Sequence, residues 1–584
     1  MPLAPLVLAQ GAGSVAGFLV LGALLSDSLW VAPALWLGLG AVTLGSLFWG
    51  WTRGRDDPAR RADALLLTLS GIALGILALS TGYVLASYAA IPADIVSFAE
   101  SSFVNDIIKW RAGVPLYTPA VDNSAYPYMP GTQLLTYGIA SLIGDPTSIP
   151  LLRKVALSYV ALAAVVAAFA GDRLLLLAVD GPVRRLRPLW WWILACVAWL
   201  AATDPRFNMF VHSLHNDGLA LLVSTAAFAA VASHLHRPRA VTWVAMAVLP
   251  AAGYLVKQSL LIWSPLLAVT LLASGRVRWK PLVAMVTASM VLAAGATWYG
   301  YARWGGEDFL FWVFSSLGNK RVSPARSAEH LLLAGGYVVA LLFWTRVMLA
   351  GGVTRPVRAL VLATAGLFLV EAYTSGIGFT PNHLGPGVVL ASLWGILAVV
   401  AAWPAADEPA GRTIRLGYGA VLAAIPVFYA GALGLVHAPR DPVPPDLARY
   451  LSAIEAEFVD QPADRVLLDH GSWPYLQSGV VMKDRADPVA LHAGANQPAI
   501  NRPMLAQTIA RIRARSYSRI LARSVETFET SYDFLHRGTG IREALLEEYQ
   551  IVRRIPAVQG VRRWWPPVLL SEVAVLEPRP RSVP

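Results

Sequence analysis

The sequence predicts an α-helical polytopic membrane protein with about thirteen transmembrane helices, followed by a small C-terminal α/β domain outside the membrane. Of its 584 residues, 56% are hydrophobic and only 14% are charged, and the mean hydropathy is +0.54. A soluble domain is about 25% charged. Apolar runs of about 15 to 25 residues recur along the chain, and each is close to the length that crosses a bilayer.

The apolar runs continue to about residue 437, where the composition changes. Lipid offers no hydrogen bonds, so each run is expected to satisfy its backbone groups as a helix. The first run lacks a basic start, so we expect a retained span and not a cleaved signal peptide. The expected spans are residues 3–25, 29–51, 65–91, 151–177, 189–203, 218–234, 241–255, 259–273, 281–303, 330–350, 356–376, 387–403 and 416–437.

Lys and Arg gather in every second loop between the expected spans. The positive-inside rule places these loops in the cytoplasm, so the N-terminus is predicted inside and the C-terminal domain outside. The net charge of +11 forms no basic stripe and accompanies no nucleic-acid motif, so nucleic-acid binding is not expected. The basic residues are Arg53, Arg55, Arg60, Arg61, Arg184, Arg185, Arg187, Arg237, Arg239, Arg276, Arg278, Lys280, Arg355, Arg358, Arg412 and Arg415.

Residues 438–584 have the composition of a separate α/β domain. Prolines near its start mark a linker, and about 140 residues are enough for an independent core. We therefore divide the chain into a transmembrane domain, 1–437, and an extracytoplasmic domain, 438–584. In the second domain, periodicity predicts helices over 447–458, 503–515 and 541–549 and strands over 465–469 and 568–576.

The loop after the third expected span carries three carboxylates close to the expected membrane surface, namely Asp94, Glu100 and Asp106. Apolar residues at helical spacing predict an amphipathic helix over 94–111 that lies on the bilayer. A carboxylate in a partly desolvated cleft has a raised proton affinity and can act as a general base. Alternatively, the carboxylates only solvate one face of this helix.

Two short motifs follow this helix: Gly-x-Pro-Leu-Tyr at 113–117 and Tyr-Pro-Tyr-x-Pro at 126–130. The whole pattern resembles the first extracytoplasmic loop of the GT-C superfamily, integral membrane glycosyltransferases that take a sugar from a polyprenyl-phosphate carrier. The resemblance implies that an acidic residue ahead of Gly-x-x-x-Tyr is the catalytic base. Glu100 matches best by spacing and Asp94 second. Many relatives have an Asp-Glu or Glu-Asp pair here, whereas Glu100 is flanked by Ala99 and Ser101, so Asp106 stays a third candidate.

Further polar residues are expected at the same membrane face. His215 and Asp217 precede a span and could orient substrate hydroxyls or ligate a divalent cation, or Asp217 could begin the helix. Glu371 lies inside a span, and a charge at such a position indicates a functional site. The predicted substrate-binding residues are Asp106, Tyr117, Tyr126, Tyr128, His215, Asp217, Glu371 and Asn382.

Basic residues of this face are candidates for holding the phosphate of a lipid-linked donor. Lys257 lies between two apolar runs, where an ammonium is unfavourable unless it reaches water or an anion. The resemblance implies a basic residue from a late loop in this role, and His383 could donate to the leaving phosphate or begin a helix. The candidates are Lys257, His383, Lys320, Arg321 and Arg326.

These observations predict an inverting glycosyltransferase of the bacterial inner membrane. By general-base catalysis it would move a sugar from a polyprenyl-phosphate donor to an extracytoplasmic glycan or glycolipid acceptor. No cofactor is expected to be required, although a divalent cation is possible. A transporter or lipid flippase is one alternative, disfavoured because no internal repeat is evident and the polar residues gather at the rim. The other is a glycan ligase or polymerase with a lipid-pyrophosphate donor.

Overall fold

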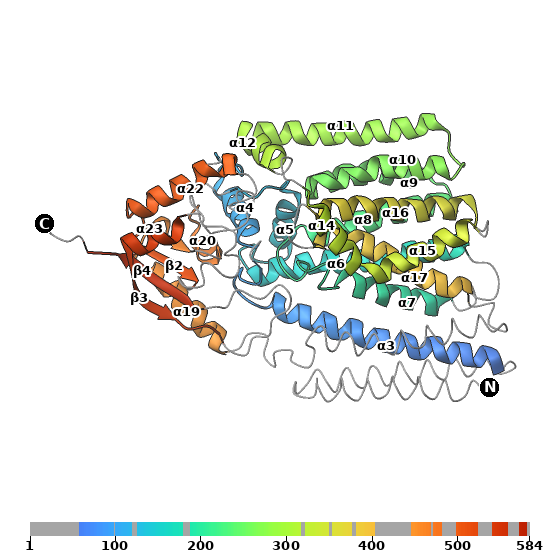
Figure 1. Ribbon diagram of the computed structural model, residues 1–584, viewed down its shortest axis with the longest axis horizontal. Coiled ribbons are helices and arrows are strands. Elements are labelled where there is room, and N and C mark those ends of the chain that lie inside the picture. Colours follow the sequence, from blue (N-terminus) through green and yellow to red (C-terminus); the bar gives the residue numbers. More distant parts are fainter. Residues whose placement is uncertain are drawn as a thin grey trace.

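The computed structural model describes residues 58–97, 100–119, 125–178, 187–316, 322–349, 353–376, 381–402, 445–468, 471–481, 498–523, 540–558 and 572–580. These residues form a long helical part with a small sheet-containing domain at one end (Figure 1). The expected spans 3–25, 29–51 and 416–437 lie outside the described residues. So does the expected domain boundary at 437, which stays a prediction.

Each expected span within the described residues is mostly helical, although 259–273 comprises η3 and α10, and 330–350 runs from the end of α14 into α15. Five helices, α3, α6, α8, α11 and α16, are long and apolar enough to cross a membrane, and α14 with α15, bent by 81° between them, could form a sixth span. The prediction of about thirteen spans is therefore not confirmed by the described residues. The helices are α3 Pro58–Ala89, α6 Ile149–Ala178, α7 Arg187–Ala202, α8 Asp217–His236, α9 Ala240–Val256, η3 Gln258–Ile262, α10 Trp263–Ala273, α11 Trp279–Trp304, α14 Pro324–Leu333, α15 Gly335–Leu349, α16 Arg355–Ser375 and α17 Gly385–Ala402.

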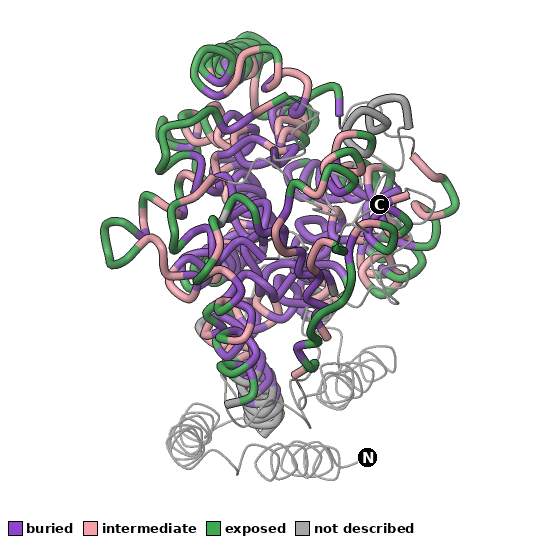
Figure 2. Tube along the Cα trace, turned by 90° about the vertical axis from the view of Figure 1, so that its left-hand side faces the viewer, coloured by how far each residue is buried: buried purple, intermediate pink, exposed green. Residues whose placement is uncertain are grey.

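Small residues bring the central helices α6 and α8 close together. A Cβ added at Gly218 on α8 would lie 3.2 Å from the carbonyl oxygen of Ala156 on α6, and Ala163 and Ala167 on α6 are fully buried. In lipid, close backbone approach of this kind replaces the hydrophobic effect as the source of helix association. The centre of the bundle is accordingly buried in the view along the helices (Figure 2).

Helix α11 lies at the edge of the bundle with most of its surface exposed (Figures 1 and 2). Trp279 at its start is 63% exposed, and Trp298 near its end is 72% exposed. At 1.5 Å per residue the two rings are about 28 Å apart along the axis, close to the hydrocarbon thickness. Exposed Trp at both ends of an apolar helix is typical of the two membrane interfaces.

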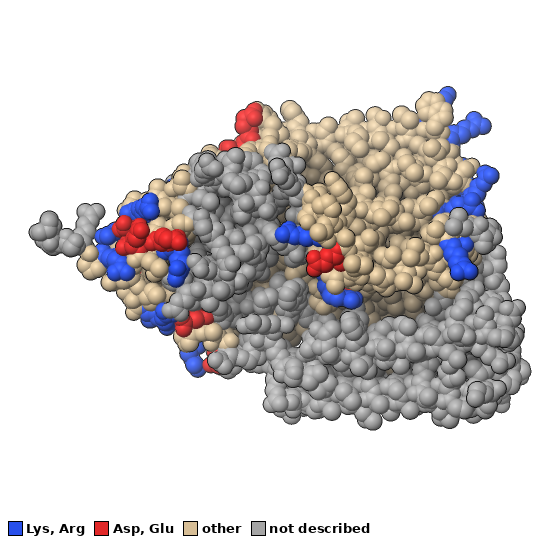
Figure 3. All heavy atoms as spheres, in the orientation of Figure 1, with Lys and Arg blue, Asp and Glu red and all other residues tan. Residues whose placement is uncertain are grey.

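Within the described residues, three of the loops predicted to be cytoplasmic, at 237–239, 274–278 and 353–355, lie at one end of the bundle; Arg53, Arg55, Arg184, Arg185, Arg412 and Arg415 lie outside the described residues. The guanidinium of Arg276 donates to the carbonyl of Leu235, and Gly275 packs against the side chain of Arg355. In the face shown in Figure 3, Lys and Arg gather at the end of the helical part that lies away from the α/β domain. The cluster of Lys257, Asp217 and Asn382 lies at the other end; the orientation of the chain in a membrane stays a prediction.

The expected surface helix over 94–111 is wrong in its start and its surroundings. The helix is α4, Glu100–Ala112, and its residues Glu100 to Lys109 are all buried. The short helix α20, Trp473–Ser478, of the C-terminal domain packs against α4 and takes the place expected for lipid. The following helix is α5, Gly131–Ile143.

The C-terminal domain is built on a four-stranded mixed sheet in the order β1-β2-β4-β3. Strand β1 pairs with β2 in parallel, and the other neighbours are antiparallel. Each predicted helix and strand has a counterpart whose ends differ by up to five residues, and residues 568–571 of the last predicted strand lie outside the described residues. Strands β2 and β3 were not expected, because the arginines that they contain interrupt their apolar alternation. The elements are α19 Pro445–Val459, β1 Val466–Leu468, α20, α22 Pro498–Arg513, β2 Arg519–Arg523, α23 Ile541–Glu548, β3 Tyr549–Ile555 and β4 Val573–Pro578.

Candidate functional site

Two buried polar networks lie at the end of the helical part that faces the α/β domain. In the first, the Glu100 carboxylate at the start of α4 accepts two hydrogen bonds from Arg153 on α6, each of 2.7 Å. It also accepts the backbone N–H of Val96 at 3.0 Å and of Leu214 at 2.9 Å. Four donors therefore occupy the acceptor positions of this carboxylate.

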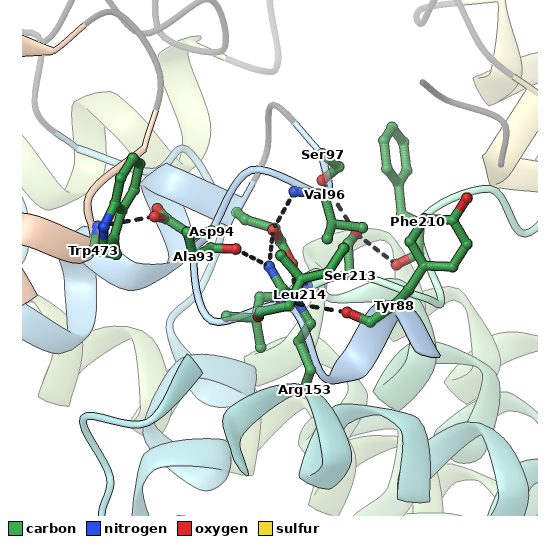
Figure 4. Close-up of polar contacts among 12 residues, drawn as sticks. Tyr88, Ala93, Asp94, Val96, Ser97, Arg153, Phe210, Ser213, Leu214 and Trp473 are labelled. Atoms are coloured by element: carbon green, nitrogen blue, oxygen red, sulfur yellow. Dashed lines mark hydrogen bonds and ion pairs between the residues drawn. The ribbon is translucent and has the colours of Figure 1, made fainter. Parts of the chain in front are cut away.

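Arg153 extends the first network to the end of α3. Its guanidinium donates to the backbone carbonyls of Tyr88, at 3.4 Å, and of Ile91 and Ala93. Figure 4 shows the Arg153 side chain pointing from its helix toward the loop that carries Ala93 and Val96. Leu214 lies beside the same group of contacts. The pair is buried, with at most 1% of either side chain exposed, so it fastens three chain segments together.

Asp94 connects this region to the C-terminal domain. Its carboxylate accepts the backbone N–H of Ser472, at 2.7 and 2.8 Å, and of Trp473, at 2.9 Å. Ser101 adds two further bonds, accepting the N–H of Gly471 at 2.8 Å and the hydroxyl of Ser472 at 3.0 Å. A buried carboxylate thus binds the first backbone amides of α20, an arrangement that favours negative charge (Figure 4).

The second network surrounds Asp217, the first residue of α8. Its carboxylate accepts the amide of Asn382 at 3.0 Å. It also faces the Lys257 ammonium at 3.4 Å and His215 Nδ1 at 3.3 Å. The side chain of Asp217 therefore binds its neighbours instead of capping α8, and Asn216 likewise donates to the carbonyl of Val256, at 2.9 Å.

Lys257 ends α9 and is almost fully buried. Burial lowers the pKa of its ammonium, but Asp217, Tyr128 and Glu371 raise it more, so this pKa lies above its usual range. Glu371 comes from α16 and accepts the N–H of Gly387 at 2.8 Å. Residues from the ends of four helices, together with Tyr128, therefore meet around one buried cation.

Aromatic rings line the His215 side of this network. Phe210 lies 4.6 Å from the His215 ring, Tyr128 lies 6.4 Å away and Tyr126 lies 6.5 Å away, measured between ring centres. Burial raises the pKa of Tyr128, so its phenol stays neutral. Tyr117 instead supports this wall, because its hydroxyl donates to the carbonyl of Tyr128 and its ring packs against Phe309.

The remaining predicted residues are placed as follows. Asp106, buried on α4, accepts the amide of Gln133 on α5 at 3.2 Å. His383 follows Asn382 directly in the 3-10 helix η5, Pro381–Leu384, and is half-buried. Arg326 lies in the first turn of α14. Lys320 and Arg321 lie outside the described residues.

No group of three or more His, Cys, Asp or Glu side chains in the described part of the chain is arranged to hold a metal ion. At His215 and Asp217, the two weak metal candidates, the nearest cation is the Lys257 ammonium. Repulsion from that ammonium would disfavour a divalent cation on the same carboxylate oxygen.

Sequence reasoning missed Arg153, the partner of Glu100. The available signal was its position: an arginine close to the start of a long apolar helix is expensive in lipid unless it is paired. It also missed the contact of Asp94 with Ser472 and Trp473. No local pattern could reveal that contact, because the donors are backbone amides 378 and 379 positions away.

No protein-family model matches the chain, and no curated protein matches it. Among solved structures, the chain is similar to the Archaeoglobus fulgidus oligosaccharyltransferase in the apo form, with a TM-score of 0.49 and 11% identity over 87% of this chain and 76% of that chain. The same enzyme tethered to an acceptor peptide gives 0.46 and 12%, over 82% and 72%. AglB from A. fulgidus with an inhibitory peptide and a dolichol-phosphate gives 0.47 and 11%, over 87% and 76%. At this identity the likeness assigns no role to any residue.

Proposed function

We propose that the protein is an integral membrane glycosyltransferase that moves a sugar from a polyprenyl-phosphate donor to a glycan or glycolipid acceptor, with inversion. The observation that carries the proposal is the buried cluster of Lys257, Asp217, His215 and Asn382. It combines a cation and a carboxylate with a neighbouring aromatic wall at one end of an apolar helix bundle. A lipid-linked phosphate and its sugar need these groups together.

Lys257 is the group proposed to hold the donor phosphate. An ammonium has three N–H donors, and among the described residues its one hydrogen-bond partner is Asp217, at a long 3.4 Å. A buried cation with unused donors favours an anion. Asn382 and His215 would keep Asp217 in place when Lys257 turns toward the phosphate. His383 and the basic residues Lys320 and Arg321 stay further candidates for this role.

The aromatic side of the cluster is the proposed place of the transferred sugar. The rings of Tyr126, Tyr128 and Phe210 offer apolar faces, while His215 and Asn382 supply polar atoms that could orient sugar hydroxyls. Apolar walls with a few convergent polar groups are typical of small-ligand sites. The lipid tail of the donor would lie among the apolar helices.

In the proposed reaction the acceptor hydroxyl attacks the anomeric carbon, a first-loop carboxylate takes its proton, and the bond to the phosphate oxygen breaks. The negative charge that develops on the phosphate is stabilised by Lys257. Single displacement inverts the anomeric centre and needs no cofactor. The base would be Glu100, Asp94 or Asp106. Protonation of Glu100 would leave the Arg153 guanidinium buried without its counterion, which disfavours Glu100 in this conformation.

The proposed orientation follows the basic loops, with their end of the bundle in the cytoplasm of a bacterial inner membrane and the cluster and the α/β domain outside. A transporter is expected to bind its cargo near the midplane. The described cluster instead lies where α8, α9, α16 and α17 begin or end.

The test is to incubate purified protein in detergent or nanodiscs with a panel of radiolabelled polyprenyl-phosphate sugars and glycan acceptors. Release of the lipid phosphate and labelling of the acceptor are measured together. We expect one donor to be consumed by the wild-type protein and not by Lys257→Met. Absence of release from every donor, with the protein shown to be folded, would reject the proposed donor class.

A further inference from the structure

We infer that Glu100 and Arg153 form a positioning unit for the Lys257 cluster, and that neither side chain takes part in the chemistry. The unit joins three segments: the end of α3 with its following loop, the start of α4, and the loop 204–216 that leads into α8. The expected effect of this unit on sugar transfer rests on the proposed function. Its expected effect on the order of loop 204–216 does not.

The decisive contact is the hydrogen bond from the Leu214 backbone N–H to Glu100 Oε1, at 2.9 Å. Leu214 precedes His215 directly and lies three positions before Asp217. A second tie lies one residue earlier, where the Ser97 hydroxyl donates to the Ser213 hydroxyl at 3.1 Å. One bond holds the last residues of the loop against the segment that follows α3 and the other holds them against the start of α4; Figure 4 shows Ser97, Ser213 and Leu214 side by side.

Loop 204–216 has no regular secondary structure of its own to hold it in place. Near its end, the Ser213 N–H binds the carbonyl of Phe210 within the loop, whereas the Leu214 N–H is bound by the Glu100 side chain from elsewhere in the fold. His215 and Asp217 supply two of the contacts around Lys257. A shift of Leu214 would move His215 at once and Asp217 through the first turn of α8. Small displacements of this kind are enough to lower catalysis.

Arg153 holds Glu100 in the orientation that reaches Leu214. Its planar fork binds both oxygens of the carboxylate, at 2.7 Å each, and its other N–H groups are engaged by backbone carbonyls. Lysine has one ammonium and cannot bind both carboxylate oxygens and these carbonyls at once. We therefore expect Arg153→Lys to fail in positioning although it keeps the charge.

The experiment compares hydrogen exchange, followed by mass spectrometry, in peptides that cover residues 208–216. The proteins are wild type, Glu100→Gln, Arg153→Lys and the double variant Glu100→Gln/Arg153→Met, all in the same detergent. The matched control is Arg187→Met, because Arg187 binds Asp172 on α6 in the same two-bond geometry, at 2.5 and 2.6 Å. We expect exchange at least ten-fold faster in 208–216 for the three test proteins, and wild-type exchange there for the control.

Sugar transfer is measured on the same preparations across pH. The positioning unit predicts that Arg153→Lys and Glu100→Gln both lower kcat/KM by similar factors, with the acid limb of the pH profile kept in the residual activity. If Glu100 were the base, Glu100→Gln alone would lose activity and the acid limb, and 208–216 would exchange as in the wild type. That result would overturn the inference.

The double variant keeps the inference testable if a single variant fails to fold, because it removes both buried charges together. Wild-type exchange in its 208–216 peptides would also overturn the inference. If no donor is ever consumed by the wild-type protein, the proposed function fails while the exchange measurement still decides the positioning role. The two failures are therefore distinguishable.

Discussion

Two buried ion pairs lie at the same end of this protein, and they differ in how completely they are satisfied. The Glu100–Arg153 pair has two bonds of 2.7 Å, two backbone N–H donors and three backbone acceptors. The Lys257–Asp217 pair is held at 3.4 Å, and among the described residues its ammonium has no other hydrogen bond. The first pair is complete without a ligand, whereas the second retains unused donors.

The difference follows from the chemistry of the two cations. A guanidinium presents five donors in a rigid fork, which suits a permanent junction between chain segments. An ammonium on a flexible stem can turn from one anion to another. The comparison teaches that burial alone does not identify a functional charge, and that the unused hydrogen-bonding capacity of a buried charge is the more informative property.

The largest expected effect on stability comes from breaking the Glu100–Arg153 pair. Arg153→Met leaves the Glu100 carboxylate buried without its cation, so we expect a loss of about 3 to 5 kcal/mol. Adding Glu100→Gln should restore much of that loss, because the pair of charges is then removed together. Thermal unfolding in one detergent measures both. Equal losses in the single and the double variant would contradict the prediction.

Breaking the Lys257–Asp217 pair should affect function more than stability. We expect Lys257→Met to lower the rate of sugar transfer by about 10²-fold to 10³-fold, equivalent to roughly 2.7 to 4 kcal/mol, as for the loss of one charge-stabilising donor. Lys154→Met is the matched control, because Lys154 is an exposed lysine of the same bundle. Transfer by Lys257→Met within three-fold of that control would remove Lys257 from the proposed site.

Removing the contact of Asp94 with the C-terminal domain should have an effect of intermediate size. Asp94→Ala leaves the amides of Ser472 and Trp473 buried without their acceptor, so we expect a loss of about 1 to 3 kcal/mol. Limited proteolysis should then cut first near residues 471–481. Asp145→Ala is the control, since Asp145 is exposed and binds Thr147 within its own turn. Unchanged proteolysis in Asp94→Ala would show that the domain docks by other contacts.

The smallest expected effect is a pH dependence at His212, which packs against Tyr88 beside the complete pair. Burial, together with the charge of Arg153, lowers the pKa of His212 to about 3. The unfolded chain binds a proton near pH 6.5 and the folded chain does not, so stability is full above that pH and falls as pH decreases. Between pH 6.5 and 5 the loss should be about 2 kcal/mol.

The measurement for His212 is the unfolding midpoint at several pH values, compared with His212→Phe. The variant should keep more of its stability at pH 5 than the wild type does, relative to each protein at pH 7. Parallel pH profiles for the two proteins would contradict the assigned pKa.

The residues of the candidate site were named from the sequence, partly from the polar residues at the rim and partly from the family resemblance, and their roles stay predictions. Few polar residues lie at the rim of an apolar helix bundle. Because every second loop is basic, the charge pattern predicts which of these polar residues lie at the same end of the bundle. Lys257, Asp217, Asn382 and His215 do meet. The surroundings of α4 could not be predicted from the sequence. The periodicity of α4 predicts one apolar face, but an apolar face can pack against lipid or against another domain. The covering helix α20 comes from more than 300 residues along the chain.

The sequence by itself determined where the apolar helices lie and which loops carry the positive charge. Hydropathy and loop charge act locally, segment by segment, so they can be read without knowing the neighbours. Only the tertiary structure decided which carboxylate is engaged by Arg153, which by backbone amides and which by Lys257. Those partners lie 53, 378 and 40 positions apart, and it is the packing of helices that brings them within hydrogen-bonding distance.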